Sequence, residues 1–382
     1  MLRLPTGDGK LMDWSPSGTE PIVPRPGGFE ARIAYAAVHV VADPLADPGP
    51  GRPPAIDWDA TLAIRRHLWN LGLGVAEAMD TAQRGSGLAW DSARELIRRT
   101  AAEPRGPAVY GAMTDQLAPG DEYSSKEIIA AYREQIEFIE GLGGQAVLMA
   151  SRHLASTAAS AEEYLTVYHE VISASSRQVH IHWLGEAFDP DLGGYWGARD
   201  PWTAAETVLE LVGAHRDKVS GVKLSLLDPD LEIDLRRRLP EGIALLTGDD
   251  FNFVDLMLGD EKGHSDALLG ILGPIAPAAT AAFQALDRGD EGTYRSLLEP
   301  TVPLARHMFS EPTFHYKTGV AFLAYLNGLQ GHFRMVGGAE SARSLPHLAR
   351  TLVLADRAGL IGHPDLAMQR MRPLLALGGV QT

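Results

Sequence analysis

The sequence predicts a (β/α)₈ barrel, or TIM barrel, followed by an all-helical extension. Short runs rich in Val, Ile, Ala and Leu alternate with longer stretches of helical periodicity, a pattern typical of βα repeats. Eight of these apolar runs occur before about residue 290, and a barrel of this kind needs eight strands. Beyond residue 290 only helical patterns remain, which predicts a C-terminal helical region.

The predicted elements follow one another in the order that a barrel requires. Strands are predicted near residues 31–40, 73–79, 108–112, 145–149, 178–184, 219–224, 242–247 and 264–271. Helices are predicted near residues 58–71, 90–102, 125–141, 161–175, 201–214, 228–238, 251–257 and 274–288. Asp91, Ser124 and Thr203 are candidate N-caps, because their side chains can accept a hydrogen bond from a free amide of the first turn.

The two ends of the chain differ from the barrel in composition. Residues 1–29 form a Pro/Gly-rich extension, residues 30–290 the barrel catalytic domain, and residues 291–382 the helical region. We expect the extension and the Pro-rich loop 43–55 to be surface features or disordered. In the tail, helices are predicted near residues 292–307, 315–329, 344–358 and 364–376.

Composition excludes several classes of protein. The net charge is −15 and there is no run rich in Lys or Arg, which argues against a nucleic-acid partner. No stretch of about 18 apolar residues predicts a membrane span, and no export signal opens the chain, so we expect a cytoplasmic protein. The absence of cysteine excludes disulfides, thiolate metal sites and cysteine nucleophiles.

Lys223 is the first candidate for catalysis, because it interrupts an apolar strand in the segment VSGVKLS. Burial disfavours the ammonium form of lysine, and the neutral amine that results is a nucleophile toward carbonyl carbon. The alternative is a structural lysine that reaches solvent or pairs with Asp249 or Asp250. Barrel enzymes place their chemistry at the carboxyl ends of the strands. This rule also selects Asp80, Thr81, Ser151, His153, His182, Trp183, Ser225, Asp249 and Asp250.

At this point the sequence resembles the dihydrodipicolinate synthase and N-acetylneuraminate lyase family of class I aldolase barrels, as a divergent member. Five collinear segments carry the resemblance: IDWDATLAIRRHLWNLGLGV, GLAWDSARELIRR, VSGVKLS, LLTGDDFNF and SEPTFHYKTGVAFLAYLNGLQGHFRM. The resemblance implies a lyase that makes or breaks a carbon–carbon bond beside a carbonyl, commonly in a 2-oxo acid. It implies a covalent imine on Lys223 without a cofactor, and a homodimer or homotetramer.

Two stretches depart from the family pattern in ways that affect the substrate. Relatives hold the substrate carboxylate with a Gly-Thr-Thr-Gly-Glu loop, where this chain has Asp80, Thr81, Ala82, Gln83 and Arg84. Asp80 would repel a carboxylate unless Arg84 neutralises it, and an N-capping role for Asp80 is the structural alternative. A 2-oxo acid and a sugar-derived carbonyl compound therefore both stay open as substrates.

The proton-shuttling tyrosine of the family is replaced by His182. We expect His182 to titrate near neutrality and to act as acid and base, with His180 on the same face of the strand. The long loop FDPDLGGYWGARDPW follows, and its Tyr195 or Trp196 is expected to cover the barrel mouth as a lid. Tyr195 is also a candidate for the missing hydroxyl.

The remaining candidates are substrate-binding or structural. Arg152 suits an anionic or polyhydroxy substrate, since its guanidinium group matches carboxylate and phosphate, but a plain surface role is equally open. One of Asp249 and Asp250 is expected to be an N-cap, and both are candidates for positioning substrate hydroxyls, as are Asp80, Thr81, His180 and Ser225. Lys317 lies on a tail helix and is expected to be structural.

Two other functions stay open. His180 and His182 could bind a divalent metal together with Glu77 or Asp250, in a metal-dependent epimerase or hydrolase. The barrel could also have lost catalysis and bind a ligand. The sequence leaves open the substrate, the direction of the reaction and the proton shuttle.

Overall fold

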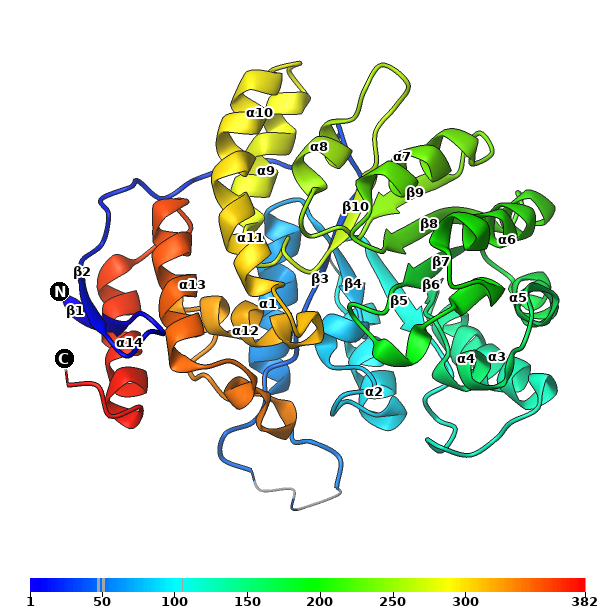
Figure 1. Ribbon diagram of the computed structural model, residues 1–382, viewed down its shortest axis with the longest axis horizontal. Helices are drawn as coiled ribbons and strands as arrows, with labels where there is room; N and C mark the ends of the chain where they lie inside the picture. Colours follow the sequence, from blue (N-terminus) through cyan, green and yellow to red (C-terminus); the bar gives the residue numbers. More distant parts are fainter. Residues whose placement is uncertain (47–48, 50–51, 105, 382) are drawn as a thin grey trace.

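The computed structural model describes residues 1–46, 49, 52–104 and 106–381. Eight parallel strands close into a barrel in the order β10-β3-β4-β5-β6-β7-β8-β9, which confirms the predicted TIM-barrel fold (Figure 1). The barrel strands are β3 (Ala34–Ala37), β4 (Gly74–Glu77), β5 (Ala108–Ala112), β6 (Gln145–Leu148), β7 (Val179–Leu184), β8 (Val219–Ser225), β9 (Ala244–Thr247) and β10 (Asp266–Leu269). Each overlaps a predicted strand.

Helices connect these strands and surround the barrel. They are α1 (Trp58–Asn70), α2 (Trp90–Ala101), α3 (Ser125–Gly141), α4 (Arg152–Thr157), α5 (Ala161–Ala174), α6 (Pro201–Ala214), α7 (Pro229–Arg238), α8 (Phe253–Leu258) and α9 (Ala276–Leu286). Ser124 caps α3 in a capping box with Glu127, as predicted. The other two cap predictions are wrong, because α2 begins after Ala89, and Asp200 caps α6 by accepting the amide of Thr203.

Small apolar side chains fill the barrel interior below the site. Ala37, Ala76, Val109, Val147 and Leu268 from five different strands pack together there with Met side chains from the loops above. Such packing makes the interior a solid core rather than a pore. Polar side chains inside the barrel therefore stand out against an apolar background.

The helical tail consists of α10 (Glu291–Leu298), α11 (Val302–Met308), α12 (Tyr316–Leu326), α13 (Leu345–Arg357) and α14 (Pro364–Leu377). The single helix predicted over 292–307 is in fact two helices. Pro300 lies in the short 3₁₀ turn between them, and Pro303 is the second residue of the second helix. Proline lacks the amide hydrogen that a continuous helix needs at these positions, and this explains the break.

The N-terminal extension is more ordered than its composition suggested. Strands β1 (Leu2–Pro5) and β2 (Leu11–Trp14) form an antiparallel hairpin, and Leu2, Leu4 and Trp14 are buried. The hairpin packs beside α13 and α14, so the two termini lie on the same side of the barrel (Figure 1). The expectation of a purely superficial or disordered segment is wrong here. Of the loop 43–55, residues 47, 48, 50 and 51 lie outside the described residues.

Within the described ranges, every helix is too short or too polar to span a lipid bilayer.

Candidate active site

Lys223 projects into the upper part of the barrel from the middle of β8. It pairs in register with His182 on β7 and with Leu246 on β9, and only 4% of its surface is exposed. Gly248 faces it: a Cβ at that position would lie 3.1 Å from Lys223 Cε and 2.0 Å from Ser225 Oγ. A glycine is therefore required after β9 to leave room for the lysine.

Burial lowers the pKa of Lys223, while the negative charges of Asp80 and Asp250 act in the opposite direction. Among the described residues, no side chain forms an ion pair or hydrogen bond with its amine. The structural alternative, in which Asp249 or Asp250 pairs with the lysine, is not observed. The amine is thus buried and unpaired, and its lowered pKa makes it easier to deprotonate to the nucleophilic form than an ordinary lysine.

Asp80 faces this amine from the loop after β4, in the short 3₁₀ turn η1 (Asp80–Ala82). Its Oδ2 accepts a hydrogen bond of 2.6 Å from the Tyr316 hydroxyl, whereas its Oδ1 is buried without a partner. Burial raises the pKa of Asp80, but the charges of Lys223 and Lys317 outweigh this and lower it to about 2. Asp80 is therefore a carboxylate with one oxygen free to accept a hydrogen bond.

The backbone around Asp80 is strained. Ala78 before it has φ 54° and Gln83 after it has φ 65°, a region that residues with a Cβ adopt at a cost of about 1 kcal/mol or more. Strain of this kind persists only where the surroundings hold it, and it is concentrated at functional sites.

Tyr316 and Lys317 complete the site from the first turn of α12. The Tyr316 hydroxyl lies 2.6 Å from Asp80 Oδ2 and 2.5 Å from Thr81 Oγ1, and its ring stacks on Phe309 at 4.3 Å. Gly270 gives the ring room, because a Cβ there would lie 2.8 Å from Tyr316 Cε2. Sequence reasoning did not select Tyr316, although the segment that resembles the family contains it.

Lys317 lies at the pocket rather than in a purely structural position, so the expectation for it is wrong. Its ammonium donates to the Phe314 carbonyl at 3.1 Å, and it is buried at the pocket wall. Burial lowers its pKa, and the negative charge of Asp80 opposes this change. Two lysines therefore act electrostatically on one carboxylate.

His182 lies beside Lys223 but does not have the predicted acid–base character. It is fully buried, its Nε2 lies 3.1 Å from Ser225 Oγ, and its Nδ1 has no partner. Burial lowers the pKa of His182 well below its usual range, and the nearby charge of Lys223 lowers it further. The imidazole is thus neutral at pH 7 and does not titrate near neutrality.

His180 lies one layer deeper, opposite Gly221, where its Nδ1 is 3.2 Å from Ser220 Oγ and its ring is near Tyr35. The metal site that would use both histidines is not formed. Glu77 points to the helices instead and makes a two-point ion pair with Arg65 at 2.8 Å. In the part of the chain that the structure describes, no three His, Asp or Glu side chains are grouped to hold a metal ion.

Arg84, considered as a group that would neutralise Asp80, pairs with another acid instead. Its guanidinium binds both oxygens of Asp115, at 2.5 and 2.6 Å, and donates to Gln135 at 2.8 Å. The carbonyls of Ala78 and Gly111 accept further bonds at 3.2 Å. Arg84 thus ties the loops after β4 and β5 together, and the positive charges near Asp80 are those of the two lysines.

Asp249 and Asp250 have different roles. Asp249 accepts the amides of Phe251 and Asn252 at 2.8 and 3.0 Å, so its carboxylate closes the turn before α8, although Asn252 is the N-cap residue. Asp250 accepts the amide of Ile271 at 2.8 Å. Burial raises the pKa of Asp250 well above its usual range. Of the two, only Asp250 acts on Lys223.

The long loop after β7 contributes to the pocket, but not through the residues predicted as a lid. Tyr195 and Trp196 are buried in an aromatic cluster, where the Tyr195 hydroxyl lies 2.9 Å from that of Tyr168 and accepts the amide of Ser151 at 3.0 Å. Neither reaches the barrel mouth. Residues 188–191 of the same loop line the pocket instead.

A pocket of about 550 Å³ opens above Asp80 at the carboxyl ends of the strands. Lys317, Phe188 and Met149 line it, and Arg152 lies at its edge in an ion pair of 2.7 Å with Asp189. The side chain of Arg152 is 44% exposed. The pocket is large enough for a small metabolite, and Asp80 is among the polar side chains that line it.

Comparison with known proteins agrees with this architecture. A family model described as "Protein of unknown function (DUF993)" matches residues 2–380. The chain belongs to this family. No curated protein matches the sequence.

Solved structures of the dihydrodipicolinate synthase family share the fold. One is a prophage protein of that family from E. coli K12 in complex with pyruvate, at 15% identity and TM-score 0.65, covering 86% of this chain and 99% of that one. Another is the chloride-inhibited dihydrodipicolinate synthase from Acinetobacter baumannii complexed with pyruvate, at 17% identity and TM-score 0.64, covering 86% and 100%. The enzyme from Thermotoga maritima has 14% identity and TM-score 0.61, covering 87% and 100%. The fold implied by the sequence resemblance is therefore confirmed.

Proposed function

We propose that this protein is a lyase of the class I aldolase type, in which Lys223 forms a Schiff base with a small carbonyl substrate. The observation that carries the proposal is the buried, unpaired amine of Lys223, which interacts electrostatically with the carboxylate of Asp80. A buried lysine with no structural partner is costly, and the nucleophilic role gives a reason for its position.

The chemistry follows from these groups. The neutral amine of Lys223 attacks the carbonyl carbon to give a carbinolamine, and loss of water then gives the protonated imine. This cation accepts the electron pair of the bond between the α- and β-carbons as that bond breaks. The β-hydroxyl group loses its proton to water, and the β-carbon leaves as the carbonyl carbon of the first product. The resulting enamine takes up a proton at carbon, and water hydrolyses the imine to release the second product and the free lysine.

Asp80 supports these steps by stabilising cationic charge on the lysine nitrogen. Its carboxylate stays ionised, because its pKa is about 2, and its free Oδ1 can accept a proton-bearing group of the substrate. Tyr316 and Thr81 fix the other oxygen through a chain of two short hydrogen bonds. Preorganised charge of this kind is usually the largest contribution to catalysis.

The same geometry favours a sugar-derived carbonyl compound over a 2-oxo acid. A substrate carboxylate in the loop after β4 would meet the negative charge of Asp80, and the Thr81 hydroxyl is already bonded to Tyr316. Arg84 is occupied by Asp115. A substrate hydroxyl, in contrast, could donate to Asp80 Oδ1. The pyruvate bound in two of the similar structures is therefore not evidence that pyruvate is the substrate of this protein.

Reductive trapping tests the proposal. The protein is incubated with borohydride and one carbonyl compound at a time: pyruvate, dihydroxyacetone or glyceraldehyde. Peptide mass spectrometry then locates the adduct. We expect a stable adduct on Lys223 and none in Lys223→Ala, while Lys126→Ala on the exposed surface of α3 behaves as wild type. An adduct that forms equally in Lys223→Ala contradicts the proposal. So does the absence of any adduct with the metabolite that the protein turns over.

A further inference from the structure

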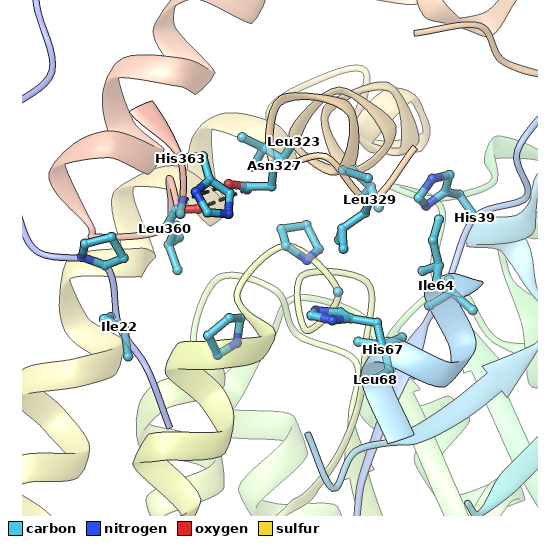
Figure 2. A pocket seen from close by; sticks show the side chains of 18 of the residues that line it. Ile22, His39, Ile64, His67, Leu68, Leu323, Asn327, Leu329, Leu360 and His363 are labelled. Carbon is cyan, nitrogen blue, oxygen red and sulfur yellow. Dashed lines mark hydrogen bonds between the residues drawn. The ribbon is translucent and has the colours of Figure 1, made fainter. Parts of the chain in front are cut away.

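A second pocket lies outside the barrel, between α1, the start of α9 and α12. It has a volume of about 180 Å³. Figure 2 shows Ile64, His67 and Leu68 of α1 on one side, Leu323 and Asn327 on the other, and Ile22 of the N-terminal segment at one end. The pocket is partly open to solvent, since Gly362 and His363 in its lining are exposed.

The walls of this pocket cannot easily collapse. Pro21, Pro274 and Pro277 line it, and proline fixes the backbone angle φ of each segment. Ile22 is anchored by a hydrogen bond of 3.1 Å from its amide to the Gly359 carbonyl. Leu323 and Ala324 belong to a helix that is buried along nearly its whole length. The space is therefore a preformed site rather than a gap that neighbouring side chains can fill.

Among the residues that the structure describes, no Asp, Glu, Lys or Arg lines the pocket. The polar side chains at its wall are largely satisfied: His39 Nε2 lies 2.6 Å from Gln330 Oε1, and the amide of Asn327 binds the Leu360 carbonyl and the Gly362 amide. Burial lowers the pKa of His39 to about 4 and that of His67 below its usual value, so both imidazoles are neutral at pH 7. The lining offers an ionised ligand no counter-charge.

His67 differs from these satisfied groups. Its ring extends from α1 into the pocket (Figure 2), and within the described chain no hydrogen bond or ion pair engages it. It provides a hydrogen-bonding point on a largely apolar surface, to which His363 adds a second imidazole. Ligand sites commonly combine an apolar lining with a few polar groups placed to fix orientation.

We infer that this pocket binds a small, uncharged, largely apolar molecule that carries one hydrogen-bonding group, held by the His67 imidazole. Apolar cavities of similar size in other proteins accept molecules such as benzene. The site is separate from the barrel mouth, because its lining shares no residue with the pocket above Asp80. The inference does not depend on the proposed lyase activity.

The test uses 4-fluorobenzyl alcohol as the probe, followed by fluorine NMR on the full-length protein. This probe has no carbonyl group and so cannot form an imine with Lys223. Ala324→Leu fills the pocket, and His67→Phe removes the hydrogen-bonding group. Ala376→Leu is the matched control, because it is the same type of substitution at an exposed position of α14. Thermal unfolding shows that each variant is folded.

We expect saturable binding in wild type, at least a tenfold loss of affinity in Ala324→Leu, a smaller loss in His67→Phe and no change in Ala376→Leu. Lys223→Ala should bind the probe as wild type does, and this separates the site from the barrel mouth. Absence of saturable binding in wild type overturns the inference. Unchanged binding in Ala324→Leu overturns it as well, because the probe would then occupy another place.

Discussion

Glu77 is fully buried at the end of β4 and Asp80, three residues later, is half-buried, and the two acids are used in opposite ways. Both oxygens of Glu77 are bonded to Arg65 at 2.8 Å, and Thr100 and the Ala78 amide donate to them as well. Arg65 in turn donates to the carbonyls of His39 and Thr61. Asp80, in contrast, keeps one buried oxygen without a partner.

The difference shows how to separate structural from functional charge inside a barrel. A saturated network fixes the backbone and leaves nothing for a ligand to bind. An unsaturated group costs free energy in the folded state, so a ligand that completes it can gain that energy back. By this criterion Lys223, which has no bonded partner, is a functional group like Asp80 and not a structural one like Glu77.

The largest effect is expected for stability, in Glu77→Gln. Arg65 would keep its charge without a balancing carboxylate in a fully buried position, and breaking a buried pair in this way costs about 3–5 kcal/mol. Urea unfolding at pH 7 measures the loss. The double variant Arg65→Met with Glu77→Leu removes both charges. Its loss of unfolding free energy should be smaller than that of Glu77→Gln. Equal stability of Glu77→Gln and wild type would contradict the structural role.

Asp80→Asn is expected to affect activity instead. Removal of the carboxylate leaves cationic charge on the lysine nitrogen without stabilisation, and we expect kcat/KM to fall about 10²–10³-fold. Stability should fall by no more than about 2 kcal/mol, since only part of the carboxylate is bonded. Steady-state kinetics on the substrate found by trapping checks the first point. If the variant keeps full activity, Asp80 is a structural acid, as Glu77 is, and the proposed role is contradicted.

The sequence predicted the barrel well because the signal is local. Each strand is a short apolar run, and a residue that breaks such a run, as Lys223 does in β8, can be recognised without a structure. The N-terminal hairpin was missed for the opposite reason. Its strands have four residues each, and Leu2 and Leu4 are buried by helices from the far end of the chain.

The sequence selected residues of the candidate site only where their own strand marks them, and it missed the partners that the fold brings to them. Asp80 and Lys223 were selected from their strand ends, but the partner of Asp80 is Tyr316, 236 residues away. No local pattern shows that α12 brings its first turn to the barrel mouth. The sequence raised Arg84 only as a group that would neutralise Asp80, whereas the fold brings Asp115 to it. Tertiary pairing of charges cannot be read from spacing alone.

Tyr316→Phe sharpens the comparison, because it frees the second oxygen of Asp80 while the ring keeps its stacking on Phe309. We expect kcat to fall about tenfold to 10²-fold with KM little changed, since the hydroxyl positions Asp80 and does not hold the substrate. Borohydride trapping on Lys223 should persist. Tyr325→Phe on the same helix, whose hydroxyl donates to the Arg370 carbonyl, is the matched control. A large rise in KM alone would show that the hydroxyl contacts the substrate.

The smallest expected effect is the pH dependence of stability that Asp80 contributes. Its pKa falls from 3.8 to about 2 on folding, because Lys223 and Lys317 favour the anion more than burial disfavours it. Above pH 3.8 the carboxylate is ionised in both states and its contribution is complete. As the pH falls through 3.8 toward 2, the unfolded chain binds the proton first and the contribution is lost.

The difference in unfolding free energy between wild type and Asp80→Asn isolates this contribution, because the other acids titrate in both proteins. It should shrink by about 2 kcal/mol between pH 5 and pH 2, as a shift of this size implies. Urea unfolding at intervals of half a pH unit measures it. A difference that stays constant over this range would mean that the two lysines do not act on Asp80 in the folded protein. The contrast with Glu77 would then rest on hydrogen bonding alone.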